Sequence, residues 1–170
     1  MNKKLITIIG PNGVGKTTTA KFLLQMRPCS AFVDAEWCRA TNPFELTTAI
    51  KKTVTDNIFC LIKNYLLCDD IETVIFPYGF HGERKSVYDQ VIRRLNNEEI
   101  VFDEHIVVLK CDYEENKRRC IKDGRDSERV ERGLKNTFGF YDGFDYPEID
   151  TTALCPQQVA EKIVERFCNE

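Results

Sequence analysis

The segment GPNGVGKTT at positions 10–18 has the residue types and spacing of a loop that binds phosphate groups. Gly10, Gly15, Lys16 and Thr17 match the pattern G-x-x-x-x-G-K-[ST], which here follows a short apolar run and precedes a segment with helical spacing. Glycines allow such a loop to wrap closely around an anion, so that backbone N–H groups and the positive end of the next helix converge on it. We therefore expect a nucleoside triphosphate to be bound by Gly10, Asn12, Gly13, Val14, Gly15, Lys16, Thr17 and Thr18.

Three side chains in or near this loop could handle the phosphates and a metal ion. Lys16 is expected to contact the outer phosphates, and the Thr17 hydroxyl to join the coordination shell of Mg²⁺. Asp34 ends the second apolar run, in FVDAEW, and should lie beside the loop at the carboxyl edge of a sheet. Its carboxylate could organise magnesium or accept a proton from an acceptor hydroxyl, and Glu36 is a weaker candidate. The alternative is that Asp34 only caps the turn that follows it.

The segments WCRATNPF and PYGFHGER follow the second and third apolar runs and should face the same edge of the sheet. Their aromatic and basic side chains could form a pocket for a polar or ring-containing acceptor. His81 could serve as a base, although a single loop histidine more often only makes a hydrogen bond in a pocket wall. The predicted acceptor-binding residues are Asp34, Trp37, Arg39, Tyr78, His81 and Arg84.

The charge-dense segment CIKDGRDSERVERGLKN begins at Cys120 and has few apolar residues. Such a composition is typical of a mobile insert, and we expect a lid at about residues 120–135. Arginines in and before it could stabilise the charge that develops during phosphoryl transfer. Because acidic residues alternate with them, they could instead form ion pairs on a solvated helix face. The arginines are Arg118, Arg119, Arg125, Arg129 and Arg132, and the interleaved acids are Asp123, Asp126, Glu128 and Glu131.

Two other uses of a phosphate loop are disfavoured. A GTPase needs an N-K-x-D string to recognise the base, whereas the nearest string, NKRR at 116–119, has arginine in the last place. A motor or transporter ATPase usually carries an acidic residue after a further strand, where it holds magnesium. The third apolar run ends VIFPYG, without an acid. Hydrolysis of the nucleotide is therefore not the expected main activity.

Short apolar runs alternate with segments of helical spacing along the whole chain. The runs predict buried strands at residues 5–9, 31–33, 73–76 and 106–109, with a weaker one around Ile149. Before the longest helix, Asn42 could provide the N-cap, Pro43 the first turn and Glu45 a return contact. The alternation predicts a parallel sheet covered by helices on both faces. Besides the helix that follows the phosphate loop, the expected helical stripes are Ile50, Val54, Ile58, Leu61, Ile62 and Tyr65; Val87, Val91, Ile92 and Leu95; and Val159, Ile163, Val164 and Phe167, the last opened by Pro156.

Composition limits the class of protein and its partners. A chain of 170 residues can bury one sizeable core, which predicts one domain over residues 1–170. The net charge of −3 gives no broad basic surface, so a small molecule is a more expected partner than nucleic acid or an anionic membrane. Eight cysteines without a C-x-x-C pair, with only two histidines, favour reduced thiols in a soluble cytoplasmic protein. No run is apolar enough to span a membrane, and nothing indicates an oligomeric state.

These motifs resemble those of small P-loop kinases of the nucleoside monophosphate kinase and shikimate kinase type, including the nucleotide kinase-like AAA proteins of bacteria. The resemblance runs through GPNGVGKTT, DAEWCRATNPFE, CDYEENKRRC, GRDSERVERGL and IDTTALCPQQVAEKI. It implies a three-layer α/β sandwich with a five-stranded parallel sheet in the order 2-3-1-4-5, a helical lid, and ATP with magnesium as the donor. It also implies roles for single residues: Asp34 contacts the acceptor or metal, Arg119 packs on the adenine, Arg125 reaches the phosphates from the lid, and Asp150 with Thr151 opens the loop that borders the base.

The leading hypothesis is an ATP-dependent phosphotransferase that moves the terminal phosphoryl group to an unidentified small-molecule acceptor. Lys16, Asp34 and Arg125 are its expected catalytic residues, and Thr17 with Asp34 its metal ligands. Two alternatives stay open. The protein could bind ATP only to sense or regulate, or it could phosphorylate nucleic acid ends, which would ordinarily need a basic groove.

Overall fold

Five parallel strands form the central sheet of the protein. The computed structural model describes residues 2–43, 45, 47–124 and 126–168. The strand order is β2-β3-β1-β4-β5, with parallel pairing between every pair of neighbours, as the resemblance implied. The strands are β1 (Lys4–Ile9), β2 (Ser30–Phe32), β3 (Thr73–Pro77), β4 (Asp103–Lys110) and β5 (Glu148–Asp150).

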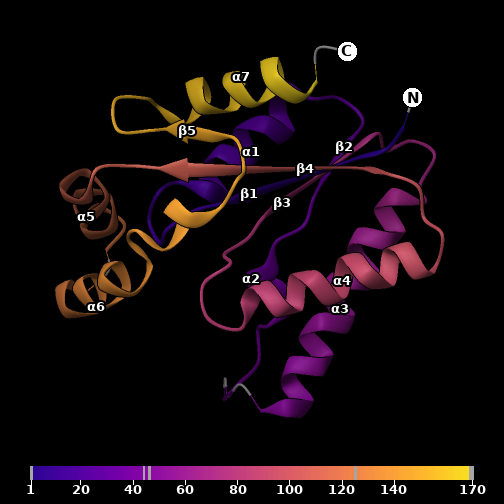
Figure 1. The fold of residues 1–170 in the computed structure, drawn as a ribbon, viewed down its shortest axis with the longest axis horizontal. Coiled ribbons are helices and arrows are strands. Elements are labelled where there is room, and N and C mark those ends of the chain that lie inside the picture. The colour runs from indigo at the N-terminus through magenta and orange to yellow at the C-terminus, as the bar shows by residue number, and fades with distance from the viewer. Residues whose placement is uncertain (1, 44, 46, 125, 169–170) are drawn as a thin grey trace.

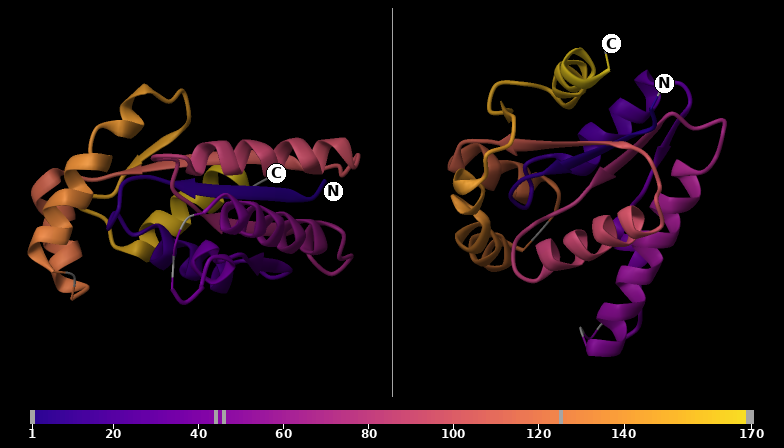
Figure 2. Two further views of the ribbon diagram at one scale, coloured as in Figure 1. Left: turned by 90° about the horizontal axis from the view of Figure 1, so that it is seen from below. Right: turned by 45° about the vertical axis from the view of Figure 1, so that its right-hand side comes forward.

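Helices cover both faces of the sheet, which makes three layers (Figures 1 and 2). On one face α1 and α7 pack side by side, and on the other α3 packs against α4. α5 and α6 stand beyond the carboxyl end of β4 (Figure 1). The helices are α1 (Lys16–Met26), α2 (Ala35–Cys38), α3 (Thr48–Leu66), α4 (Arg84–Asn97), α5 (Tyr113–Lys122), α6 (Ser127–Thr137), the short 3₁₀ helix η1 (Phe140–Gly143) and α7 (Pro156–Phe167).

Strand residues alternate between two apolar cores, one on each side of the sheet. Leu5 and Ile9 of β1 belong to the core under α3 and α4, whereas Ile6 and Ile8 belong to the core under α1 and α7. β3 is buried along its whole length. Strands buried on both faces read as continuous apolar runs, so the runs predicted the strands correctly, to within two residues for all but β4. β4 begins earlier, at Asp103, because its polar first residues still pair with β1.

The predicted start of the longest helix is wrong. α3 begins at Thr48, and its N-cap is Thr47, whose hydroxyl accepts a hydrogen bond from the Ile50 amide at 3.2 Å. Asn42 lies several residues before this cap. Of the predicted α3 stripe, Val54, Ile58 and Ile62 are buried, Ile50 and Tyr65 are partly buried, and Leu61 is 38% exposed.

The expected lid segment forms helices with a small core of their own. Cys120 of α5 packs with Val130 and Leu134 of α6, and Tyr113 lies against them. Arg125, and the side chain of Arg129, lie outside the described part of the structure. All eight cysteines are free thiols. No described helix has the length and apolarity needed to cross a lipid bilayer.

Candidate active site

The phosphate loop connects β1 to α1 and packs closely against its neighbours. Gly13 has φ +82°, and a Cβ atom there would lie 2.0 Å from Cys120 Sγ and 2.9 Å from Asn116 Oδ1. Gly10 has φ +147°, and a Cβ atom there would lie 2.4 Å from the carbonyl oxygen of Leu109. Both positions therefore require glycine, because a side chain would clash as well as strain the backbone.

The side chain of Lys16 folds back onto the phosphate loop. Its Nζ donates hydrogen bonds to the carbonyl oxygens of Gly10 at 2.9 Å and Pro11 at 2.8 Å. The ammonium is thus held where the loop amides and the N-terminus of α1 would concentrate an anion. The geometry fits the role predicted for Lys16 at the outer phosphates.

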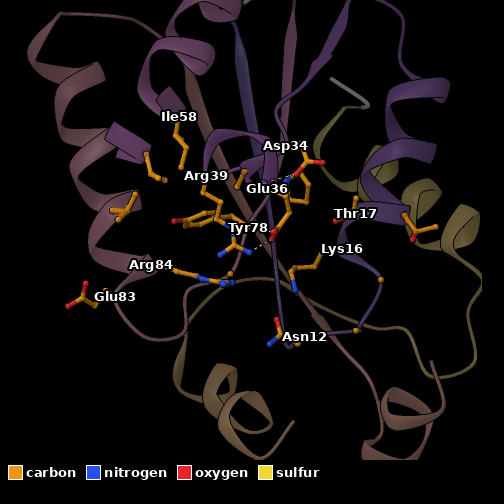
Figure 3. A pocket seen from close by; sticks show the side chains of 18 of the residues that line it. Asn12, Lys16, Thr17, Asp34, Glu36, Arg39, Ile58, Tyr78, Glu83 and Arg84 are labelled. Carbon is orange, nitrogen blue, oxygen red and sulfur yellow. Dashed lines mark hydrogen bonds and ion pairs between the residues drawn. The ribbon is translucent and has the colours of Figure 1, made fainter. Parts of the chain in front are cut away.

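A cavity of about 330 Å³ opens beside the phosphate loop (Figure 3). The loop and the start of α1 form one wall, and α2, α3 and the β3–α4 connection form the others. Ten of the predicted site residues line it: Asn12, Gly13, Gly15, Lys16, Thr17, Thr18, Asp34, Arg39, Tyr78 and Arg84. Donor-binding and acceptor-binding candidates, predicted from separate motifs, therefore share one cavity.

Asp34 caps helix α2 and also lines the cavity. Its Oδ1 accepts a hydrogen bond from the Glu36 amide at 2.9 Å, which caps α2. The other carboxylate oxygen makes no hydrogen bond to the described residues and belongs to a side chain that lines the cavity. The cap fixes the carboxylate at the sheet edge, close to the Thr17 side of the loop (Figure 3).

Basic side chains occupy the wall opposite the phosphate loop. Arg39 forms an ion pair with Glu36, and Lys51 of α3 contacts Glu83 at 2.8 Å. Figure 3 shows Arg39 and Arg84 pointing into the cavity next to Tyr78, across from Lys16. Burial raises the pKa of the Tyr78 hydroxyl to about 12, so it stays protonated at neutral pH.

Sequence reasoning missed several residues of the cavity wall. Val54 and Ile58 were predicted only as members of an apolar helical stripe. Lys51 could have been predicted from helical spacing, because it lies three residues before Val54 and therefore on the same helix face. Glu83 lies in the segment PYGFHGER and Asp123 among the acids of the predicted lid, but neither was predicted to line the site. The missed lining residues are Ala35, Lys51, Val54, Ile58, Pro77, Gly79, Glu83, Val87 and Asp123.

Two predicted acceptor-binding residues do not line the cavity. Trp37 is 80% exposed on α2. His81 is half-buried, with Nδ1 3.3 Å from the Tyr141 hydroxyl. Burial, reinforced by the charges of Arg84, Lys16 and Arg39, lowers the pKa of His81 to about 4. The imidazole is therefore a weak base, which favours the interpretation of His81 as a hydrogen-bonding wall residue.

Arg119 joins the phosphate loop to the β5–α7 connection, outside this cavity. Its guanidinium donates to Thr151 Oγ1 at 3.0 Å, to the Thr151 carbonyl at 2.7 Å and to the Val14 carbonyl at 3.3 Å. Asp150 caps the same connection by accepting hydrogen bonds from the Thr152 amide and hydroxyl at 2.9 and 2.7 Å. The residues predicted to border the base thus form one cluster next to the loop.

The arginines predicted for the lid have different surroundings. Arg118 pairs with Glu115 on the exposed face of α5, and together with Arg119 it lowers the pKa of that carboxyl to about 2. Arg132 is exposed. For Arg118 the structure favours the solvated ion-pair interpretation. The expectation for Arg125 stays a prediction, because the residue is outside the described part of the chain.

No protein-family model matches the chain, and no curated protein matches it. Solved structures match almost its whole length. The tunicamycin resistance protein of Deinococcus radiodurans is 23% identical with a TM-score of 0.66, and the match covers 98% of this chain and 96% of that one. Shikimate kinase from Acinetobacter baumannii, in complex with shikimate, is 17% identical with a TM-score of 0.63, covering 97% and 93%. APS kinase from Mycobacterium tuberculosis, in complex with AMPPNP and APS, is 13% identical with a TM-score of 0.64, covering 96% of both chains.

The chain has the fold of small P-loop kinases. The likeness to these structures extends over nearly the full length of the chain. At sequence identities of 13–23%, the likeness to these structures establishes the fold of the chain alone. The chemistry depends on the side chains that line the cavity.

Proposed function

We propose that the protein is an ATP-dependent kinase that transfers the terminal phosphoryl group of ATP to a small-molecule acceptor. The observation that carries this proposal is the shared cavity, which places Lys16 of the phosphate loop and Asp34 of the β2–α2 junction around one space. Its volume of about 330 Å³ suits a small ligand beside the outer phosphates of a nucleotide. The kinases among the structural neighbours support the same reaction type.

The residues of the loop fit a donor bound with magnesium. The loop amides and Lys16 would hold the phosphates, while Thr17 and Asp34 each present an oxygen to the cavity. Mg²⁺ prefers oxygen ligands and keeps several waters, so the Thr17 hydroxyl would hold it directly and Asp34 through one of those waters, which leaves the unbonded carboxylate oxygen able to accept a proton. When bound, the ion would neutralise charge on the phosphate oxygens.

In the transfer itself, the acceptor hydroxyl oxygen forms a bond to the terminal phosphorus, and the bond from that phosphorus to the bridging oxygen breaks. The acceptor proton leaves to a base, and the unbonded oxygen of Asp34 is the group placed to take it. Lys16 stabilises the phosphoryl oxygens during the step. Closure of the α5–α6 lid over the loop would exclude water and thereby suppress hydrolysis. As the site of this reaction we propose the cytoplasm, which suits both ATP as donor and free thiols.

The test is incubation of the protein with labelled ATP, Mg²⁺ and a pooled metabolite extract, followed by a search for a new phosphorylated compound. We expect one product, absent with Lys16→Ala, which removes the ammonium that contacts the loop. Lys21→Ala, on the exposed face of α1, is the matched control and should retain activity. If calorimetry shows that ATP binds and no product appears, the protein is a nucleotide sensor and the kinase proposal fails.

A further inference from the structure

Helices α5 and α6 contact the phosphate loop at Asn12 and Gly13. The Asn12 amide donates to Thr137 Oγ1 of α6 at 3.4 Å, and the Cys120 thiol of α5 donates to the Asn12 carbonyl oxygen at 3.7 Å. The first bond is longer than an ordinary N–H···O hydrogen bond, and a thiol is a weak donor. The hydrogen bonds that join the two helices to this part of the loop are therefore weak.

Asn116 of α5 lies one turn before Cys120 and faces the same part of the loop. It is completely buried, and its Oδ1 lies 2.9 Å from the position of a Cβ atom built on Gly13. Neither its Oδ1 nor its Nδ2 has a hydrogen-bond partner among the residues that the structure describes. Buried amides ordinarily form hydrogen bonds, because desolvating their polar atoms without a partner is costly. A residue kept at this cost beside a ligand-binding loop points to a role in function rather than in stability.

The peptide group that joins Asn12 to Gly13 can provide Asn116 with a partner. Its carbonyl oxygen faces α5, where it accepts the bond from Cys120. In a planar trans peptide the N–H points away from the carbonyl oxygen, so the Gly13 N–H points away from α5. Gly13 lines the cavity beside the loop, whereas Asn116 does not. A donor on α5 that holds the Asn12 carbonyl therefore directs the Gly13 amide towards the phosphate side of the loop.

We propose that Asn116 is a positioning residue: its Nδ2 donates a hydrogen bond to the Asn12 carbonyl when the loop binds phosphate, which fixes the Gly13 amide towards the phosphate oxygens. This inference rests on the proposed function, in which the phosphates of ATP are the ligand of the loop. Gly13 has no Cβ atom, so the peptide before it can turn by the small amount that this bond requires. Because the Asn116 amide is satisfied only in the phosphate-bound arrangement, its hydrogen bond adds to the affinity for phosphate and not to the stability of the free protein.

Two substitutions at Asn116 separate the effect of its amide from that of its packing. Asn116→Leu fills a similar volume and Asn116→Ala leaves space, but both remove the donor. We expect each to raise the Kd of a non-hydrolysable ATP analogue with Mg²⁺ about 10-fold in calorimetry, the effect of losing one buried hydrogen bond. Glu114→Ala, on the exposed face of the same helix, is the control and should leave the Kd unchanged. An unchanged Kd in both Asn116 variants would overturn the role of Asn116 and leave the kinase proposal intact.

Thermal unfolding without ligand distinguishes positioning from a structural role. Asn116→Leu should unfold at the same temperature as the parent protein or at a higher one, because it removes two buried atoms that have no partner among the described residues. Affinity and stability are thus expected to change independently or in opposite directions. A lower unfolding temperature together with weaker binding in Asn116→Leu would assign Asn116 a structural role and contradict the proposal.

Inorganic tripolyphosphate with Mg²⁺ locates the effect at the phosphate end of the nucleotide. Because tripolyphosphate has no base, its affinity should fall in both variants by the same factor as that of the ATP analogue. A loss for the analogue alone would mean that Asn116 acts through Arg119 and the cluster at the β5–α7 connection, which would contradict the inference. If the parent protein bound neither ligand, the kinase proposal and this inference would both be overturned.

The side-chain amide of Asn116 can also be observed directly by NMR. Its two N–H signals are assigned by their loss in Asn116→Leu. Saturation with the ATP analogue should shift at least one of them downfield and slow its exchange with solvent, because that proton enters a hydrogen bond. Signals that keep their positions at saturation would show that no such bond forms and would overturn the proposal.

Discussion

Asp34 combines an observed cap with a proposed role in phosphoryl transfer, and its two oxygens allow the two to be separated. Oδ1 accepts the Glu36 amide that opens α2, and the second oxygen is available to the cavity. An asparagine at this position keeps an oxygen for the cap but loses the negative charge. An alanine loses both.

Asp34→Asn should therefore reduce phosphoryl transfer by about 100-fold or more, the range of general-base catalysis, and change the free energy of unfolding little. Asp34→Ala should also lower the free energy of unfolding by about 1 kcal/mol, because the cap is lost. Initial rates and urea unfolding measured on both variants give the two effects independently. Equal rates in Asp34→Asn and the parent protein would mean that the carboxylate only caps α2.

His81 links the charge of the cavity to pH. Its pKa falls from an ordinary 6.5 to about 4, first because of burial and then because of Arg84, Lys16 and Arg39. Between these values the unfolded chain binds a proton that the folded protein does not. The linkage relation then makes the stability rise with pH through this window, so stability is lost as the pH falls from about 6.5 towards 4.

His81→Gln should flatten that part of the dependence of unfolding free energy on pH. An NMR titration of the imidazole signals measures the pKa directly, and the only other histidine, His105, can be replaced to assign them. A His81 resonance that titrates near pH 6.5 would contradict the positive potential of the basic wall opposite the phosphate loop.

At the scale of the elements, the strands were easier to predict than the starts of the helices. A strand buried on both faces must be apolar throughout, so runs such as residues 5–9 carry their own signal. A helix start depends on which of several polar residues provides the cap. For α3 the string from Asn42 to Glu45 had the expected composition, but the hydroxyl of Thr47 takes the role.

The contributions of the two candidate N-caps of α3, Thr47 and Asn42, can be measured separately. Thr47→Ala should lower the free energy of unfolding by about 1 kcal/mol, because the Ile50 amide loses its hydrogen bond. Asn42→Ala, at the position that sequence alone favoured, should change it by less than about 0.5 kcal/mol. Urea unfolding of both variants compares them directly. A larger effect at Asn42 would place the cap where the sequence pattern suggested.

Across the whole molecule, the candidate site was predictable where one short segment determines it. The phosphate loop needs only its own spacing, and Asp34 needs only the end of its strand. Lys51, Glu83 and Asp123 join the cavity because α3, α4 and α5 converge on it, which depends on helix packing between segments distant in sequence. The same dependence explains why Trp37, next to a correctly predicted segment, faces solvent instead.

The packing of α5 and α6, the segment predicted to be a lid, also depends on contacts between segments distant in sequence. α6 packs on α5 through a small core of Cys120, Val130 and Leu134, and α6 reaches the phosphate loop through the Asn12 amide and the Thr137 hydroxyl, 3.4 Å apart. A segment with so few buried contacts opens more readily than the sheet. Binding of a donor to the loop should therefore slow its opening, since the ligand adds contacts to the closed form.

Hydrogen exchange measured with and without Mg²⁺ and a non-hydrolysable ATP analogue should show slower exchange of the α6 amides in the presence of the analogue. α7 provides the internal control, because it packs on α1 over one face of the sheet, whereas α6 stands beyond the carboxyl end of β4, and α7 should exchange equally in both states. Protection confined to residues 10–18 would mean that the donor binds without engaging α6. In that case the exclusion of water during transfer would have to come from the acceptor itself filling the cavity between Asp34 and Arg84.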